Sequence, residues 1–340
     1  MKKNDFAKYL SDFLSKYLPG QRNASPHTIA SYRDVFKLLL IFCDSIKSIK
    51  PEKIKVSDLS KELVLNFLDW LETERKCSVS TRNQRLAVIH SFVHYVQKES
   101  PENLYELKKI LSIPNKKYTR VLVAYLTGQE MQILLSQPDM STTVGFRSAV
   151  LLSVLYDTGS RVQELINIRV KDVRLSSPAV IRLHGKGNKV RQVPLMGKTS
   201  ENLRLYLQMK KYHSGISRGD NFAFVNQEKN KLSRWGVSYI LNKYVAKARN
   251  DVGFNIDFPV TPHVLRHSKA MHLLQSGVNL IYIRDFLGHV DSSTTEVYAR
   301  ADSEMKRKAI EKAYVNLVPE AIPKWEEDGN LMKWLNSICH

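Results

Sequence analysis

The chain has 340 residues, 43% of them hydrophobic and 25% charged, which is the composition of a globular protein long enough for two domains. Its 52 lysines and arginines exceed its 33 aspartates and glutamates and leave a formal net charge of +19, so we expect a polyanionic partner, with DNA or RNA ahead of an anionic membrane surface. The cysteines Cys43, Cys77 and Cys339 form no CxxC pair, which argues against a disulfide framework and against a zinc site. The N-terminus is charged throughout, unlike a signal peptide, and the longest apolar run, VFKLLLIFC, is too short to span a membrane, so we expect a cytoplasmic protein.

Residues 1–112 are predicted to form a helical domain. Ser25 is expected to cap a helix that has Pro26 in its first turn, and Ser60 and Ser80 are expected to cap two more amphipathic helices. The apolar faces of the first and third helices are predicted to consist of Ile29, Tyr32, Phe36, Leu39 and Leu40, and of Leu86, Ile89, Val93 and Val96.

Polar and basic side chains gather at the start of the third helix, where we find Arg82, Asn83 and Arg85. Such residues on the first turns of a helix suit insertion into a DNA major groove. For one such helix alone, a solvated helix face is the simpler explanation. The three residues are therefore candidate DNA contacts.

Residues 113–126 are predicted to be a basic linker, because they contain Lys116, Lys117 and Arg120 and follow a run of helices. A basic linker suits contact with a phosphate backbone, although a plain exposed linker has the same composition. Thr127 and Glu130 have the spacing of a capping box and mark the start of a second domain, residues 127–318, which a tail of residues 319–340 follows.

The second domain is predicted to be mainly α with a small antiparallel sheet. A buried helix, FRSAVLLSVLYDTG, should end at Gly159, and a short helix should begin near Ser160. The stretch AVIRLHGKGNKVRQVPL has two strand-like runs around a glycine-containing turn and predicts a β-hairpin. Further helices are expected at residues 200–213, 233–250, 262–276, 279–287 and 303–317, with another near the end of the chain.

The helix that follows Thr261 carries His263, Arg266 and His267 on one face, at positions i, i+3 and i+4. The N-terminus of a helix already favours an anion, so this face is a candidate phosphate site. A metal site formed by the two histidines is the alternative, but the sequence HVLRH lacks the glutamate of HExxH.

A wider set of residues fits phosphoryl transfer without a metal. It has no paired carboxylates, and it consists in chain order of Arg161, Lys186, His263, Arg266, His289 and Tyr298. Forked guanidiniums are able to bind phosphate oxygens where other enzymes use metal ions, and a tyrosine becomes a nucleophile when cations and a proton acceptor stabilise its phenolate. We therefore expect no metal and no cofactor, although Tyr298 taken singly is best explained as a core residue.

The motifs TGSRVQELINI, HGKGNKVRQVPL, TPHVLRHSKAMHLL and IRDFLGHVDSSTTEVYAR together resemble those of the tyrosine recombinases, the phage-integrase and Xer class. The likeness extends over residues 5–318, because the helical first third resembles the core-binding domain of the same family. It implies a two-domain, C-shaped DNA clamp, in which a helical core-binding (SAM-like) domain precedes the catalytic domain.

The resemblance also implies a role for each motif residue. Arg161 and Arg266 would clamp the scissile phosphate, with Glu164 supporting Arg161. Lys186 would protonate the leaving 5′-oxygen. The remaining roles would be a hydrogen bond from His263 and His289 to phosphate oxygens, acceptance of the tyrosine proton by His263, and attack by Tyr298 to leave a 3′-phosphotyrosine.

The implied partners are double-stranded DNA recombination sites, on which the family assembles as a homo-tetramer through a Holliday junction, so the protein is expected at the nucleoid. The tail, with Trp325, Leu331, Trp334 and Leu335, fits docking on a neighbouring subunit or packing within its own. Its length favours a mobile-element integrase or transposase over Xer-type dimer resolution. A binding-only protein of this fold and a type IB topoisomerase are two further hypotheses.

Overall fold

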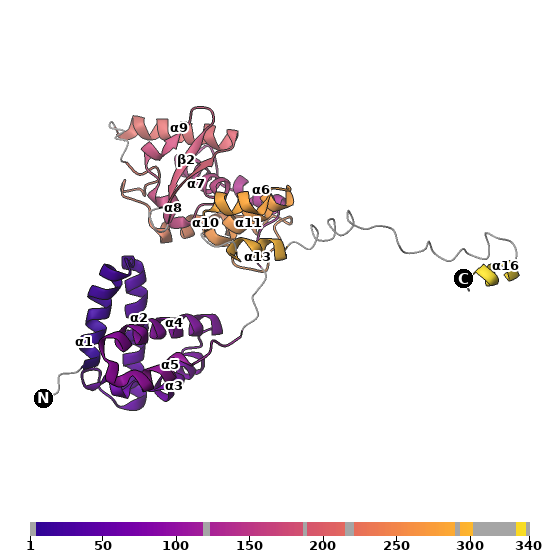
Figure 1. Ribbon diagram of the computed structural model, residues 1–340. Coiled ribbons are helices and arrows are strands. Elements are labelled where there is room, and N and C mark those ends of the chain that lie inside the picture. The colour runs from indigo at the N-terminus through magenta and orange to yellow at the C-terminus, as the bar shows by residue number, and fades with distance from the viewer. Residues whose placement is uncertain are drawn as a thin grey trace. The chain divides into compact units, whose positions relative to one another are not determined.

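The computed structural model describes residues 5–117, 123–185, 189–214, 221–289, 293–301 and 331–337. The chain divides into two compact units, Met1–Val121 and Leu122–His340, and the division falls within the predicted linker (Figure 1). Each unit has a hydrophobic core of its own. Among the described residues, no helix combines the length and the apolar character that crossing a membrane requires.

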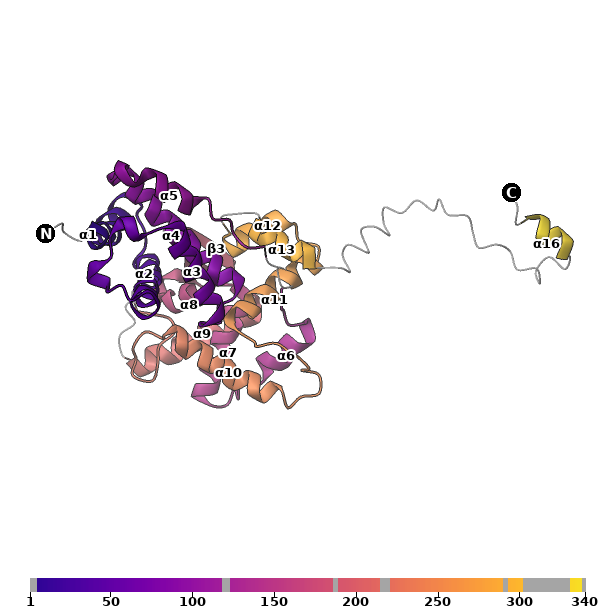
Figure 2. The same cartoon turned by 90° about the horizontal axis from the view of Figure 1, so that it is seen from below.

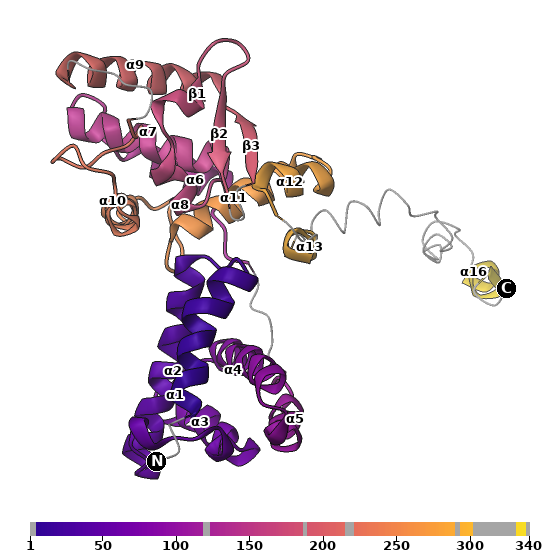
Figure 3. The same cartoon turned by 60° about the vertical axis from the view of Figure 1, so that its left-hand side comes forward.

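The described part of the first unit is helical, as predicted. Its α-helices are α1 (Asp5–Asp12), α2 (Pro26–Lys47), α3 (Lys61–Thr73), α4 (Val79–Glu99) and α5 (Leu104–Leu111). A π-helical segment, Phe13–Gln21, joins α1 to α2, and short 3-10 turns lie at Pro51–Lys53, Val56–Asp58 and Pro101–Asn103. Helices α3, α4 and α5 pack against one another (Figure 3).

Two of the three predicted helix caps are confirmed. Ser25 Oγ accepts a hydrogen bond from the backbone N–H of Thr28, and Ser60 Oγ accepts one from Leu63. The cap predicted at Ser80 is wrong, because Ser78 caps α4 and accepts from the N–H of Thr81 at 3.3 Å. Ser78 has the extended backbone that a cap requires, so the helix begins two residues earlier and gains the hydrogen bonds of those residues.

The core of the first unit is rich in aromatic rings. Phe92 of α4 lies 5.0 Å from Phe36 and 5.3 Å from Phe13, centroid to centroid, with the rings close to perpendicular. The predicted apolar face of α4 is confirmed, since Leu86, Ile89, Val93 and Val96 are all fully buried. Each such side chain contributes about 1.5–3 kcal/mol of burial free energy, so this core is a large favourable term in the folding of the unit.

The second unit combines helices with a small sheet, one face of which is exposed. Its elements are α6 (Gly128–Ser136), α7 (Thr143–Thr158), α8 (Val162–Asn167), β1 (Val173–Arg174), β2 (Val180–His184), β3 (Val190–Pro194), α9 (Gly197–Ser214), α10 (Arg234–Ala248), α11 (Pro262–Gln275), α12 (Leu280–Leu287) and α13 (Ser293–Ala301). Helix α16 (Leu331–Ser337) follows later in the chain. The helix predicted at residues 303–317 lies outside the described residues.

The predicted hairpin is confirmed. Strands β2 and β3 pair antiparallel with Ile181 opposite Val193 and Leu183 opposite Arg191. The sheet has a third strand, β1, that the sequence did not predict, because two residues carry no periodic signal. The side chains of Ile181 and Leu183 point into the core, which fixes the register of the hairpin.

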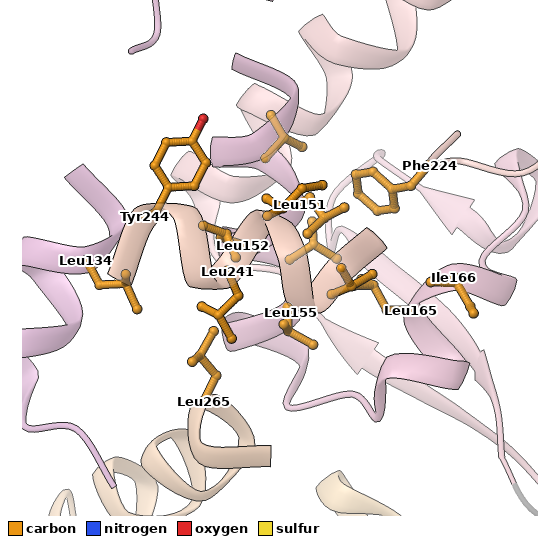
Figure 4. Close-up of a cluster of buried hydrophobic side chains, with 14 of the residues drawn as sticks. Leu134, Leu151, Leu152, Leu155, Leu165, Ile166, Phe224, Leu241, Tyr244 and Leu265 are labelled. Carbon is orange, nitrogen blue, oxygen red and sulfur yellow. The ribbon is translucent and has the colours of Figure 1, made fainter. Parts of the chain in front are cut away.

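Helix α7 forms the centre of the core and packs against α9 and α11. Figure 4 shows its leucines, Leu151, Leu152 and Leu155, meeting side chains from neighbouring elements: Leu165, Phe224, Leu241 and Leu265. A smaller cluster joins α11, α12 and α13, which lie side by side (Figure 2). Its members include Met271, Ile283, Leu287 and Tyr298, so the packing of these three helices places the tyrosine side chain.

Candidate active site

Glu164 holds the first predicted site residue, Arg161, in place. Helix α7 ends at Gly159, whose φ of +53° turns the chain, and Arg161 then becomes the N-cap residue of α8. The backbone N–H of Arg161 donates to Glu164 Oε2 at 2.8 Å, and its Nη1 donates to Glu164 Oε1 at 3.1 Å. Glu164 is only 4% exposed, so this carboxylate fixes a partly exposed guanidinium from the protein side.

Arg191 of β3 belongs to the same cluster and was not predicted. Its Nη1 and Nη2 donate to the two carboxylate oxygens of Glu164 at 2.9 and 2.7 Å, and its Nε donates to the carbonyl of Phe286 at 2.9 Å. Arg191 lies on the same side of β3 as the buried Val193. The sequence signal that could have identified Arg191 is a charged residue at an inward-facing position of a predicted strand.

These contacts outweigh the effect of burial on Glu164. Burial alone would raise the pKa of its carboxyl, but the hydrogen bonds and charge of Arg191, followed by those of Arg161, hold the pKa below its ordinary value. Glu164 is therefore a buried carboxylate shared by two guanidiniums.

Arg266 of α11 is 2% exposed. Its Nη1 donates to the carbonyl of Gly159 and its Nη2 to the carbonyl of Leu287, both at 2.7 Å. The side chain thus ties α11 to the ends of α7 and α12. Burial and the charge of Arg161 lower its pKa to about 10, so the guanidinium keeps its charge at neutral pH and favours an anion beside it.

Tyr298 of α13 is 2% exposed, and its hydroxyl is hydrogen-bonded to His267 Nδ1 at 2.9 Å. Burial raises the pKa of the phenol, while the charges of Arg266 and Arg161 oppose that rise. The two arginines are thus close enough to stabilise a phenolate at this position.

Two histidines, His267 and His289, contact the ring of this tyrosine, and His263 stacks on His267. The ring of His289 lies nearly parallel to that of Tyr298, with 6.3 Å between centroids, and its Nδ1 is hydrogen-bonded to Thr295 Oγ1 at 2.9 Å. The rings of His263 and His267 stack at 6.2 Å. Burial, followed by nearby positive charges, lowers the pKa of His289 to about 4 and also lowers that of His263, so both are neutral at pH 7.

The predicted site residues that the structure describes therefore lie together in the second unit. Hydrogen bonds, ring contacts or mutual charge effects link Arg161, Glu164, Arg266, His289 and Tyr298, and the charges of both arginines lower the pKa of His263. Lys186 lies outside the described residues. His267 was placed on this helix face from the sequence but was given no role, because its contact with Tyr298 depends on tertiary packing.

The predicted DNA contacts of the first unit are largely occupied by other groups. Arg82 is 3% exposed and donates to the carbonyl of Pro114 and to Asn83 Oδ1. Asn83 in turn exchanges hydrogen bonds with the backbone of Lys116. These contacts indicate that Arg82 holds the start of the linker against α4. Its role as a DNA contact stays a prediction.

The remaining candidates differ in how available they are. Arg85 Nη1 lies 2.9 Å from Cys77 Sγ, and Lys116 Nζ forms a 2.6 Å ion pair with Glu72. Lys117 is exposed and has no ion pair among the described residues, whereas Arg120 lies outside them. Asn83, Arg85 and the two lysines stay predictions. Across the described ranges, no three His, Cys, Asp or Glu side chains are grouped so as to hold a metal ion.

Residues 124–305 match the model of the phage integrase family, and residues 10–100 match that of the phage integrase N-terminal SAM-like domain. This chain belongs to the phage integrase family of tyrosine recombinases. The family is a class of DNA strand transferases, so this chain is an enzyme of that class. The two matched segments fall in the two units of the structure.

Relatives of this recombinase align over nearly the whole chain. The integrase/recombinase y4rC of Sinorhizobium fredii is 37% identical over 98% of both chains, and tyrosine recombinase XerC of Pelotomaculum thermopropionicum is 30% identical over 90% of this chain and 97% of its own. The integrase of transposon Tn1549, solved with transposon right end DNA, shares the fold with a TM-score of 0.68 at 16% identity, over 89% of this chain and 98% of its own.

Proposed function

We propose that this recombinase cuts and rejoins specific DNA sites through Tyr298. Its phenolic oxygen attacks the scissile phosphorus, which leaves a 3′-phosphotyrosine and a free 5′-hydroxyl, and the hydroxyl of a second DNA end then reverses the step. One observation carries this proposal. The Tyr298 hydroxyl lies where the charges of Arg266 and Arg161 stabilise a phenolate, and it is next to the neutral histidines His267 and His289.

The two arginines are proposed to bind the nonbridging oxygens of the phosphate. Guanidiniums stabilise the negative charge of the transition state when they are oriented in advance. Arg161 is oriented by Glu164, which Arg191 holds in turn, and Arg266 is oriented by two backbone carbonyls. Both guanidiniums are therefore held in defined orientations by the protein itself.

His263 and His289 are proposed to donate hydrogen bonds to the phosphate, and Lys186 to protonate the leaving 5′-oxygen. The phosphotyrosine ester conserves the energy of the broken bond, so the proposed reaction consumes no ATP. The proposed partners are double-stranded recombination sites, bound by a tetramer that passes through a Holliday junction. The apolar residues in the sequence of α16, Leu331, Met332 and Leu335, support its docking on another subunit.

Integration and excision of a mobile element is the biological role we favour, because the 37% identical relative carries the name integrase/recombinase. Resolution of chromosome or plasmid dimers is the second candidate, and the full-length likeness to XerC favours it. Inverted repeats in the DNA that flanks the gene would support the first role.

The test uses nicked suicide duplexes made from the flanking DNA, which trap the covalent protein–DNA adduct. We expect an adduct at Tyr298 with the wild type and none with Tyr298→Phe, while both bind the duplex. Tyr244→Phe is the matched control, because Tyr244 is also 2% exposed but lies in the core of the same unit. An adduct formed by Tyr298→Phe would refute the proposal, as would site-independent relaxation of supercoiled DNA by a monomer.

A further inference from the structure

The contact between His267 and Tyr298 joins a residue without an assigned role to the proposed nucleophile. His267 Nδ1 lies 2.9 Å from the phenolic oxygen, within the reach of direct proton transfer. The two rings are 5.6 Å apart and tilted by 58°, so an edge of the imidazole meets the hydroxyl. Within the described residues, this is the hydrogen bond that the Tyr298 hydroxyl makes to a side chain.

The neighbouring two histidines are less well placed to receive the proton. His289 lies face to face with the tyrosine ring, and its Nδ1 is already bonded to Thr295. His263 is one helical turn before His267 and stacks on it, on the side exposed to solvent. Their positions suit contact with a phosphate rather than with the phenolic proton.

We infer that His267 is the proton acceptor for Tyr298, in the place that the family resemblance gave to His263. The inference rests on the proposed function. As the bond from Tyr298 Oη to phosphorus forms and the bond from phosphorus to the 5′-oxygen breaks, the phenolic proton moves to His267 Nδ1. The 5′-oxygen takes its proton from the general acid, and in the reverse step His267 returns its proton to the phenolate oxygen.

The surroundings of His267 keep it ready to accept a proton. The charged and titratable groups near it are His263 and Arg266 on its own helix, Tyr298 on α13 and His289 before α13. Burial, followed by His263 and Arg266, lowers its pKa to about 4, which leaves it neutral at pH 7. A bound phosphate would add negative charge and raise the basicity of His267 when the reaction needs it.

The first experiment compares His267→Gln with His272→Gln. His272 lies on the same helix, and its Nδ1 is hydrogen-bonded to the hydroxyl of Tyr156 at 2.8 Å, so it is a matched tyrosine–histidine pair away from the phosphate. Adduct formation should slow by roughly 10²–10⁴-fold in His267→Gln at unchanged duplex affinity, and by less than about tenfold in His272→Gln. An adduct rate in His267→Gln equal to or above that of the wild type would overturn the inference.

A second comparison separates proton acceptance from a structural role. A 5′-bridging phosphorothiolate duplex releases a thiolate, which requires no general acid, so it should not restore His267→Gln. A fluorinated, more acidic tyrosine at position 298 should restore most of the lost rate, because its phenol loses its proton more readily. Rescue by the phosphorothiolate, or no rescue by the fluorinated tyrosine, would contradict proton acceptance by His267.

A measurement without DNA tests the contact alone. In ¹⁵N-histidine NMR spectra, His267 should be the neutral tautomer with its proton on Nε2, and Tyr298→Phe should shift its Nδ1 signal. A proton on Nδ1 would exclude the inferred direction of transfer. If Tyr298→Phe lacks the adduct and His267→Gln reacts normally, only this inference fails, whereas an adduct in Tyr298→Phe removes the proposed function as well.

Discussion

Among single residues, Glu164 has the largest influence on the site. Its carboxylate accepts hydrogen bonds from the backbone and side chain of Arg161 and from both terminal nitrogens of Arg191. Breaking a buried ion pair by removing one partner costs about 3–5 kcal/mol, because the remaining charge stays buried without compensation. The orientation of Arg161 and the stability of the second unit therefore depend on the same carboxylate.

Glu164 should also make stability depend on pH in a defined window. Its pKa in the folded protein lies below its ordinary value of 4.5, so its charged form contributes stability that is complete above the unfolded pKa and is lost as the pH falls through the folded pKa. We expect the free energy of unfolding of the wild type to fall more steeply below about pH 5 than that of Glu164→Gln. Urea denaturation at several pH values measures the difference.

The control for this measurement is Glu106→Gln, because Glu106 pairs with Lys109 on the exposed surface of α5. An exposed pair contributes little, so this variant should follow the wild type at every pH. Parallel curves for Glu164→Gln and the wild type would show that the carboxylate is not stabilised by folding.

The residues of the site differ in how far the sequence alone could predict them. Arg266 and His263 were predictable, because a capped helix places them together at its first turns. The roles of His267 and Arg191 depend on partners 31 and 27 positions away, which helical or strand periodicity cannot supply. For the same reason Arg82 resembled a surface residue in the sequence, although the carbonyl of Pro114 and the side chain of Asn83 enclose it.

At the scale of elements, local signals predicted most of the structure. Serine and threonine caps, the glycine that ends α7 and the alternation in the hairpin each act within a few residues, so the sequence displays them directly. The start of α4 was missed because Ser78 and Ser80 are both suitable caps. Strand β1 was missed because its pairing with β2 is decided by tertiary structure.

The turn at Gly159 links the end of α7 to the site. Its φ is +53°, and a Cβ atom there would lie 2.9 Å from Leu287 Cδ2 and 3.2 Å from Phe286 Cε1. Its carbonyl also accepts the hydrogen bond from Arg266. We expect Gly159→Ala to destabilise the protein by more than the roughly 1–2 kcal/mol of a left-handed alanine and to slow adduct formation, because the clash displaces that carbonyl.

Gly277→Ala separates these two effects. Gly277 has a φ of +82°, but a Cβ atom there would meet nothing within 4 Å, so this variant carries the backbone strain without the clash. Thermal unfolding and the adduct rate should show a modest loss of stability and normal chemistry for Gly277→Ala. Equal effects of the two substitutions would mean that the contacts of Gly159 with α12 do not matter.

At the scale of the whole molecule, the chain has two separate hydrophobic cores and a large positive charge. Each unit buries its own apolar side chains. The net charge of +19 supplies an attraction to DNA that is independent of sequence and falls with salt. Which lysines provide that attraction depends on whether acidic neighbours already neutralise them.

Lys116 and Lys117 allow this dependence to be measured. Lys116 is paired with Glu72 at 2.6 Å, whereas Lys117 is exposed and unpaired within the described residues. A lysine that neutralises one phosphate contributes about 0.9 to the slope of log affinity against log salt. Lys117→Ala should therefore lower the slope by nearly that amount, on flanking DNA and on an unrelated duplex alike, and Lys116→Ala should lower it less. A slope unchanged by Lys117→Ala would remove this lysine from the interface, and a larger change for Lys116→Ala would mean that DNA breaks its pair with Glu72.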